Sequence, residues 1–240
     1  MEPTAAPLPT PVATLLPTPD PVGPPAAVPV LPAPTPVPTP TPRPTPRPTA
    51  TPTPPPAPAP TPSTLFSDNF ESYAPGTTPG GSWSAGSGTW DVLSDGTKVA
   101  QVTATGVMFV AGNSSSTWAN YKVSASVKAP TSGYSKLVAR YQDANYFYVC
   151  GLDNGGTLFL GKLYGGTWYS FSTATYSYSP TSWYQVSFTV VGDNLTCTAN
   201  DGSGHTQTVS ATESYFSSGP AGLAGSAGAE FDNFTVTPAA

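Results

Sequence analysis

Residues 184–190 read Tyr-Gln-Val-Ser-Phe-Thr-Val, and residues 121–128 read Tyr-Lys-Val-Ser-Ala-Ser-Val-Lys. In both stretches an apolar side chain recurs at every second position, with a polar side chain between. Because successive side chains of an extended strand point to opposite faces of a sheet, this period of two indicates strands with one buried and one wetter face. Helical spacing is nearly absent from the chain, so the sequence predicts an all-β fold.

Shorter runs of the same kind follow one another from residue 63 onward, separated by turn residues. Gly, Asn and Asp tolerate positive φ or cap their own backbone, so residues 142–145, 153–156 and 192–193 are expected to form hairpin turns. Many short strands with turns at this spacing are typical of an antiparallel two-sheet sandwich. Further strands are expected at residues 89–93, 98–103, 107–111, 137–141, 146–152, 157–163, 167–171 and 194–199.

The first 62 residues have a different composition. They hold 26 of the 32 prolines, alternating with Thr and Ala, whereas the first of the 27 aromatic residues is Phe66. Proline fixes φ and has no N–H, so this segment is expected to be disordered or in a polyproline II conformation. The sequence therefore predicts a Pro/Thr-rich linker over residues 1–62 and one β-sandwich domain over residues 63–240.

Charge and hydropathy exclude several classes of partner. The domain from residue 63 carries six Lys or Arg against eleven Asp or Glu, and this acidic balance argues against nucleic acid. No apolar run is long enough to span a bilayer, so membrane insertion is not expected. The chain also starts in linker composition without a signal peptide, which suggests that a secretion signal or an upstream catalytic domain is missing.

Five short motifs in the domain resemble, in this order, those of concanavalin-A-like lectin/glucanase jelly rolls. No single motif is diagnostic, but together they span nearly the whole domain. They lie at residues 66–71 (Phe-Ser-Asp-Asn-Phe-Glu), 88–92 (Gly-Thr-Trp-Asp-Val), 118–121 (Trp-Ala-Asn-Tyr), 139–146 (Ala-Arg-Tyr-Gln-Asp-Ala-Asn-Tyr) and 231–236 (Phe-Asp-Asn-Phe-Thr-Val).

The resemblance carries expectations about function. Such domains are appended to secreted bacterial pectate lyases and glycosidases, where Pro-Thr linkers join modules and the jelly roll binds carbohydrate. It implies an extracellular or cell-surface, non-catalytic carbohydrate-binding module that tethers an enzyme or a cell surface to a polysaccharide or oligosaccharide. The alternative is an adhesin or structural fibre component whose exposed Tyr and Trp bind a protein or another copy of the chain.

Candidate sugar-binding residues follow from the chemistry of a pyranose, whose C–H faces pack on aromatic rings while its hydroxyls seek polar side chains. Arg140 is a candidate because its parity is opposite to that of Ala139 and Tyr141, and its guanidinium suits hydroxyls or a uronate. Tyr148 on the next strand and the adjacent pair Trp168 and Tyr169 complete the set. Each of these has a structural alternative: Arg140 could equally bond a loop carbonyl or pair with Asp143.

A calcium site is the second expectation from the resemblance. The first strand near residue 66 and the last strand near residue 236 would be neighbours, which brings their acidic motifs together. Asp68, Glu71 and Asp232, with backbone carbonyls, would supply the oxygen ligands that calcium requires. The alternative is that these carboxylates only cap turns.

Other features bear on catalysis and on the core. The acidic Glu-x-Asp-x-x-Glu cluster of sandwich-fold glucanases is missing, and no catalytic residue is predicted. Cys150 and Cys197 occupy apolar positions of two strands, either as a disulfide or as two small buried residues. The aromatic residues expected in the core are Phe70, Trp90, Phe147, Phe188, Phe231 and Phe234.

Overall fold

The alternating runs that open the sequence analysis form two adjacent strands. In the computed structural model, which describes residues 63–112, 114–180 and 182–240, they are β4 (Tyr121–Lys128) and β9 (Tyr184–Val191). The two strands pair antiparallel, with Val123 opposite Phe188 and Ala125 opposite Val186. All four of these apolar side chains are buried, so the period of two marks the core face as predicted.

The described chain is almost entirely β-structure. Its only helical element is a short 3-10 turn, η1 (Ser115–Thr117). The remaining strands are β1 (Phe66–Asp68), β2 (Trp83–Asp95), β3 (Thr97–Val110), β5 (Ser135–Asp143), β6 (Tyr146–Asp153), β7 (Thr157–Tyr164), β8 (Thr167–Thr175), β10 (Asn194–Asn200), β11 (Thr206–Thr212), β12 (Gly222–Gly225) and β13 (Glu230–Pro238).

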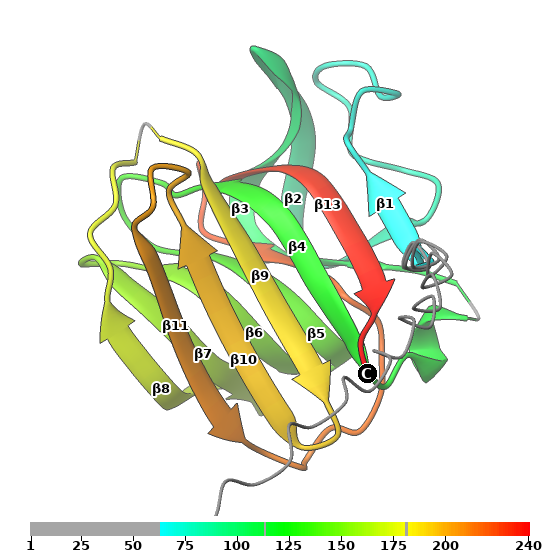
Figure 1. The fold of residues 1–240 in the computed structure, drawn as a ribbon. Helices are drawn as coiled ribbons and strands as arrows, with labels where there is room; N and C mark the ends of the chain where they lie inside the picture. Colours follow the sequence, from blue (N-terminus) through cyan, green and yellow to red (C-terminus); the bar gives the residue numbers. More distant parts are fainter. Residues whose placement is uncertain (1–62, 113, 181) are drawn as a thin grey trace, which may run out of the picture. The chain divides into compact units, whose positions relative to one another are not determined.

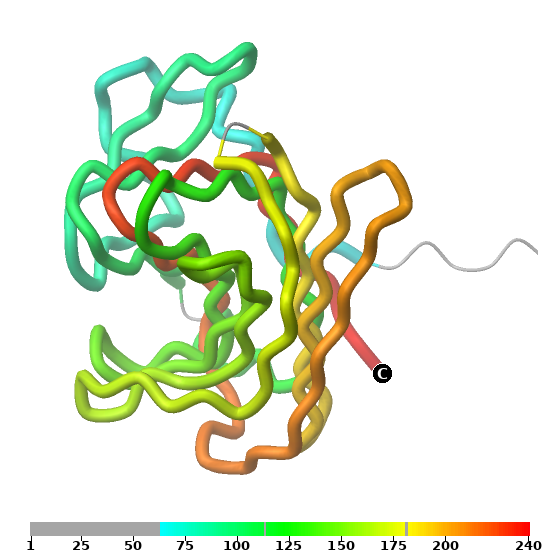
Figure 2. Tube along the Cα trace, turned by 90° about the vertical axis from the view of Figure 1, so that its left-hand side faces the viewer, coloured from blue at the N-terminus to red at the C-terminus, as the bar shows by residue number. Residues whose placement is uncertain are grey.

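The strands form two antiparallel layers (Figures 1 and 2), which confirms the predicted sandwich. One layer has the order β11-β10-β9-β4-β13, with β1 on the far side of β13. The other has the order β8-β7-β6-β5-β12-β3, with β2 beyond β3. We call these the front layer and the back layer, after their positions in Figure 1.

The layers are joined through β13 and β3, where Glu230 pairs with Gln101 and Phe231 with Ala100. The two layers are therefore parts of one hydrogen-bonded sheet that folds over on itself. β1 pairs with β13, and Phe66 lies opposite Val236. This pairing confirms the expectation that the first and last strands of the domain are neighbours.

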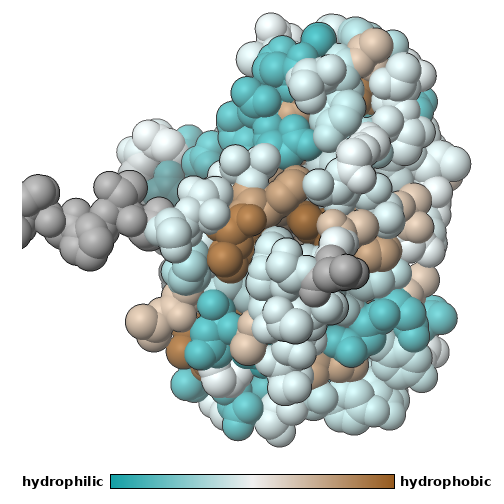
Figure 3. Space-filling model, turned by 90° about the vertical axis from the view of Figure 1, so that its right-hand side faces the viewer, coloured by the Kyte–Doolittle hydropathy of each residue, from teal (hydrophilic) through white to brown (hydrophobic). Residues whose placement is uncertain are grey.

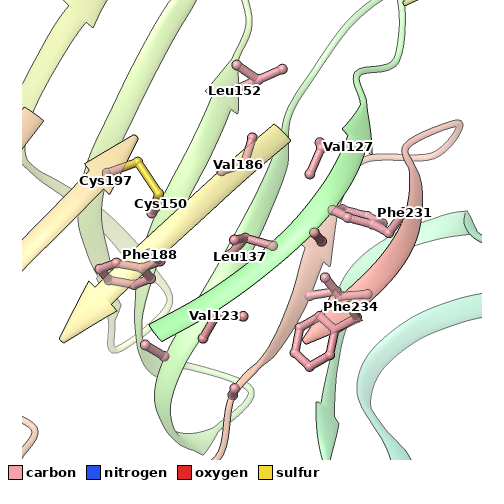
Figure 4. Packing of buried hydrophobic residues seen from close by; sticks show 14 of the residues in the cluster. Val123, Val127, Leu137, Cys150, Leu152, Val186, Phe188, Cys197, Phe231 and Phe234 are labelled. Atoms are coloured by element: carbon pink, nitrogen blue, oxygen red, sulfur yellow. A yellow bond between two sulfur atoms is a disulfide. The ribbon is translucent and has the colours of Figure 1, made fainter. Parts of the chain in front are cut away.

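Buried apolar side chains from both layers fill the space between them (Figure 4). Of the six aromatic residues expected in the core, five belong to this cluster: Phe70, Trp90, Phe188, Phe231 and Phe234. Phe147 is equally buried, but it packs in a second apolar cluster on the outer face of the back layer. A disulfide between Cys150 on β6 and Cys197 on β10 crosses this core and ties the layers together. Of the two alternatives left by the sequence, the structure has the disulfide.

The strands differ from the sequence-based expectation in two ways. Residues 98–103 and 107–111, expected as two strands, belong to the single strand β3. Strands β11 and β12 were not predicted. The predicted linker over residues 1–62 lies outside the described residues, so its conformation stays a prediction.

Candidate functional site

A row of four aromatic rings crosses the outer face of the back layer, on the side away from the core. Phe109 on β3 stacks on Tyr141 of β5 with ring centroids 4.2 Å apart. Tyr141 stacks on Phe147 of β6 at 5.8 Å, and the edge of Phe147 meets Trp168 of β8 at 6.2 Å. We call these four residues the aromatic row. Phe109, Tyr141 and Phe147 belong to a second apolar cluster that is separate from the core between the layers, and of these Tyr141 and Phe147 are buried.

Two cavities flank the aromatic row. One, of about 270 Å³, is bounded by Phe109 and Tyr141 together with Gln142 and the segment 218–220. The other, of about 200 Å³, is bounded by Phe147 and Trp168 together with residues of β2, β3 and the turn at Asn145. Both are smaller than the roughly 300 Å³ at which sites for drug-sized ligands begin, so each fits one small ring. We refer to the aromatic row and its two cavities as the groove.

A buried lysine supports the Trp168 end of the groove. The Nζ atom of Lys136 lies 4.7 Å from the ring centroid of Trp168, 4.7 Å from that of Tyr134 and 4.0 Å from that of Phe159. It also donates to Oδ2 of Asp153 at 2.7 Å. Burial lowers the pKa of Lys136, and the Asp153 carboxylate opposes that shift. Three rings and one carboxylate thus hold a cation beneath the exposed indole.

Glycine makes the close approach of β2 to the aromatic row possible. A Cβ atom at Gly86 would collide with the hydroxyl of Tyr141. Burial raises the pKa of Tyr141 to about 12, and the negative charge of Asp143 adds to the shift. The Tyr141 hydroxyl therefore stays protonated at neutral pH and can serve as a hydrogen-bond donor.

Arg140, predicted to contact sugar, is instead 1% exposed, and this prediction is wrong for the folded domain. Its guanidinium donates to three backbone carbonyl oxygens, those of Ala119, Phe216 and Gly192. The reason is a bulge in β5, where Arg140 has φ of 50° and the register with β6 shifts after Ala139. The extra residue places Ala139 and Tyr141 on opposite faces of the sheet, so the regular alternation of side chains is interrupted at this point.

Tyr148, also predicted to contact sugar, is fully buried in the core, so this prediction is wrong too. It shares parity with Cys150, which the sequence already placed at a core position, and this signal could have identified it. Its hydroxyl accepts a hydrogen bond from the backbone N–H of Phe216 at 2.8 Å. Arg140 and Tyr148 therefore hold the segment after β11, which continues into residues 218–220 at the wall of one cavity.

Trp168 and Tyr169 do not form one cluster, because consecutive residues of a strand point to opposite faces. Trp168 is 39% exposed and borders the second cavity, and its contact with sugar stays a prediction. Tyr169 is 46% exposed on the other face, where its ring lies 6.2 Å from that of Tyr164. Tyr164 in turn meets Tyr215, whose hydroxyl is 3.1 Å from the Tyr164 hydroxyl.

The three carboxylates expected to bind calcium are not gathered into one site. Asp68 accepts hydrogen bonds from the Phe70 backbone N–H, the Tyr73 hydroxyl and the Trp83 indole. Among residues 63–112, 114–180 and 182–240 there is no group of three or more acidic, His or Cys side chains placed to share a metal ion. The predicted three-carboxylate arrangement is therefore not formed, and calcium itself stays a prediction.

Glu71 and Asp232 are the two of the three that interact. Burial raises the pKa of Asp232, and the negative charge of Glu71 adds to this shift. Asp232 accepts from the Asn233 backbone N–H and the Thr97 hydroxyl, and Glu71 accepts from the Lys98 backbone N–H. The two carboxylates are therefore close enough to influence each other's charge.

A larger hollow of about 640 Å³ adjoins Asp68, between β1, β13 and the segment 72–82. Its lining includes the polar side chains of Ser67, Asn69, Ser72, Ser82 and Asn233, but none of the exposed large apolar side chains, such as the Trp168 ring of the groove. Both carboxylate oxygens of Asp68 are already bonded, and the Phe66 ring packs against Trp83 at 5.5 Å and Phe234 at 6.0 Å. Burial and the hydrogen bond to Asp68 raise the pKa of Tyr73 to about 12.

The fold is similar to that of solved carbohydrate-binding modules and lectins. A carbohydrate-binding module, CBM66 from Bacillus subtilis, superposes with a TM-score of 0.56 at 18% identity, covering 68% of this chain and 99% of that one. Lectin II from Ulex europaeus gives a TM-score of 0.51 at 14% identity, covering 73% of this chain and 99% of the lectin. The domain thus has the lectin-like jelly-roll sandwich fold that its motifs predict.

An enzyme structure also shares the fold over part of its length. The GH43 protein BlXynB from Bacillus licheniformis gives a TM-score of 0.54 at 12% identity and covers 72% of this chain, but only 39% of the enzyme is matched. No protein-family description and no curated protein sequence matches this chain. In the part of the chain that the structure describes, no helix has the length and apolar character needed to cross a membrane.

Proposed function

We propose that this protein is a non-catalytic carbohydrate-binding module, and that the groove on the outer face of the back layer is its ligand site. The observation that carries the proposal is a ring-sized cavity at each end of the aromatic row. One lies beside the half-buried Phe109 and the other beside Trp168, which is 39% exposed, while Tyr141 and Phe147 form the buried middle of the row. Aromatic faces pack against the C–H faces of sugars, and the polar groups around them suit sugar hydroxyls. The likeness in fold to a carbohydrate-binding module and a lectin supports the same reading.

The polar groups of the groove are suited to hydroxyl recognition. Gln142 is exposed and is held by bonds from its side-chain amide to the carbonyl oxygens of Arg140 and Ser218. Ser87, Thr105 and Asn145 border the second cavity, and Tyr141, whose hydroxyl lies against Gly86 of β2, borders the first. Side chains held by existing contacts lose little conformational entropy when a ligand binds.

The domain acts as an anchor in this proposal. The Pro/Thr-rich segment over residues 1–62 serves as a semi-rigid linker that keeps an attached enzyme or cell surface close to the polysaccharide, raising its effective concentration. The disulfide between the layers suits a protein that works outside the cytoplasm, where such bonds persist. Hydrolysis of the bound glycan belongs, in this proposal, to a partner module.

The alternative of an adhesin or fibre component predicts a broad apolar surface. On the side of the domain drawn in Figure 3, hydrophobic residues gather in a small central area bordered by hydrophilic surface above and below. The exposed large apolar side chains of the described residues are Leu65, Leu93, Trp168, Tyr169 and Tyr215. Of these, only Tyr169 and Tyr215 are linked by ring contacts, through Tyr164, and Trp168 lies on the opposite face of β8. This distribution favours a ligand groove over a protein-binding face.

The test uses the full chain on a panel of immobilised pectin, xylan, β-glucan, fructan and chitin. We expect retention on at least one glycan, and Trp168→Ala should weaken it about tenfold or more, as the loss of one aromatic stacking contact implies. Tyr169→Ala is the matched control, because it removes a neighbouring exposed ring of the same strand from the other face. We expect its retention to equal that of the unaltered chain.

Each outcome has a definite meaning. Retention lost in Trp168→Ala alone supports both the function and the site. Retention lost in Tyr169→Ala alone keeps sugar binding but moves the site to the face that carries Tyr164 and Tyr215. No retention on any glycan rejects the proposed function.

A further inference from the structure

We infer that the groove selects neutral glycans and rejects those that carry carboxylate or sulfate groups. This inference rests on the proposed function and adds the charge class of the ligand. It also replaces the expectation that Arg140 could meet a uronate, because that guanidinium is buried and bonded to backbone carbonyls.

The lining of the groove contains no charged side chain. The first cavity is bounded by Phe109, Ser116, Tyr141, Gln142, Ser218, Gly219 and Pro220. The second is bounded only by apolar side chains, hydroxyls, glycines and the amide of Asn145, apart from the phenol of Tyr134. An anionic ligand placed there would lose its hydration without gaining an ionic partner, which is costly.

Most lysine side chains of the described residues already bind an acidic side chain or a backbone oxygen. Lys136, the cation nearest the aromatic row, is 2% exposed and donates to Asp153 at 2.7 Å. Lys162 pairs with Glu213 at 3.1 Å, and Lys128 lies between Asp95 and Glu230 at 2.8 and 3.1 Å. Lys98 donates to the backbone oxygen of Glu71 at 2.7 Å.

Lys122 is the remaining lysine of the described residues. It is exposed on β4, in the front layer, whereas the groove lies on the outer face of the back layer. With Arg140 bonded to carbonyl oxygens, no described Lys or Arg is available at the groove to receive an anion. Recognition of uronates and sulfates depends on such a donor, because charge-assisted bonds from Arg or Lys are the strong ones.

The carboxylates near the groove are repulsive toward an anion. Asp143 lies close enough to contribute to the raised pKa of Tyr141, and Asp153 does the same for Tyr134. Because Asp153 is paired with Lys136, the carboxylate of Asp143 is the negative charge near the groove that no described cation offsets, in line with the acidic balance of the whole chain.

The test compares polymers that differ only in charge. β-Glucan, fructan and chitin are each paired with a derivative oxidised to a carboxylate at the primary hydroxyl, and with the methyl ester of that derivative. The ester controls for the lost hydroxyl, since it has the same carbon skeleton without the charge. We expect the ester to be retained, and the carboxylate to bind about tenfold more weakly, with the difference shrinking as salt is raised above about 0.1 M.

A designed cation provides a second arm. Asn145→Lys places an ammonium at the border of the second cavity and should increase retention of the carboxylate polymer several-fold, in a salt-sensitive way. Thr208→Lys adds the same charge at an exposed position of β11 in the front layer and should leave both retentions unchanged. Lys122→Ala should likewise have no effect.

The outcomes separate this inference from the proposed function. Retention of the carboxylate polymer equal to or tighter than that of its ester overturns the inference, while binding of any glycan preserves the proposed function. A panel on which no neutral or charged polymer is retained rejects both. Retention of neutral polymers with a carboxylate penalty that Asn145→Lys relieves and Thr208→Lys does not supports the inference.

Discussion

At the scale of single residues, the sequence predicts the core better than the site. Five of the six aromatic side chains expected inside lie in the core between the layers. The sixth, Phe147, is buried in the cluster on the outer face of the back layer, while its neighbour Tyr148 faces the core. At Arg140 the alternation of side chains is interrupted, because a bulge with positive φ places the residues on either side on opposite faces of the sheet. Nothing in the local sequence marks this bulge, because Arg is not a residue that favours positive φ.

The buried guanidinium gives a stability prediction. Arg140→Met removes bonds to three carbonyl oxygens and leaves them unpaired, so we expect the free energy of unfolding to fall by about 3 kcal/mol or more. Urea denaturation measures this change. Lys122→Met on an exposed face should shift the same quantity by less than about 0.5 kcal/mol. Unchanged stability in Arg140→Met would contradict the structural role given to this side chain.

Asp232 gives a prediction that depends on pH. Its folded-state pKa is raised, chiefly by burial, so the folded protein binds a proton more readily than the unfolded chain does. Ionisation of Asp232 therefore costs stability above its folded pKa, and this cost disappears as pH falls below the ordinary value of 3.8. We expect Asp232→Asn to raise the Tm near neutral pH and to lose that advantage in acid.

The same variant tests calcium. If calcium binds at Glu71 and Asp232, the ion should raise the Tm of the unaltered chain by neutralising the two carboxylates, and a chelator should remove the increase. Asp232→Asn should then respond less to calcium. A Tm that calcium does not change in either protein would reject the ion at this place and leave the pH prediction intact.

At the scale of strands, β11 and β12 were not predicted from the sequence, and each omission has a physical cause. β12 (Gly-Leu-Ala-Gly) shows no alternation because it is buried on both faces between β3 and β5. Gly222 is needed there, since an added Cβ would collide with the carbonyl oxygen of Met108. β11 was not predicted because it lies at the edge of the front layer, where Thr, Ser and Gln replace the apolar residues that mark a strand.

The link between β6 and β10 carries the prediction at this scale. The disulfide of Cys150 and Cys197 spans 47 residues of sequence and joins the two layers. Replacing both cysteines with Ala should lower the free energy of unfolding by about 2–4 kcal/mol, mainly because the unfolded chain gains freedom. Chemical denaturation with and without reductant measures it. The double variant should be insensitive to reductant, and an equal response of both proteins would contradict the prediction.

At the scale of the whole domain, the sequence predicts the two-layer architecture but not how the layers are joined. β13 of the front layer pairs with β3 of the back layer, so loss of order in either layer removes a hydrogen-bonded neighbour of the other. Sheet pairing between distant segments such as residues 100–101 and 230–231 leaves no local signal. The order of the five motifs was the feature that revealed the fold.

This continuity predicts cooperative unfolding. We expect far-ultraviolet circular dichroism, which reports the sheet, and tryptophan fluorescence, which reports the packing around Trp83 and Trp90, to give one coincident transition. Two separated transitions would show that the layers unfold independently. Reduction of the disulfide should shift the single transition without splitting it.

The pairing of β1 with β13 has a mechanical consequence. The chain enters the described domain next to Leu65, whose N–H donates to the Val236 carbonyl at 2.8 Å, and β1 comprises only Phe66 to Asp68. A pulling force that arrives along the chain from residue 63 loads this three-residue strand first and can peel it from β13 bond by bond. Because β1 borders the front layer and the groove lies on the back layer, the first few bonds to yield are not those that shape the groove. Fraying of β1 under force would therefore leave the strands that line the groove in place.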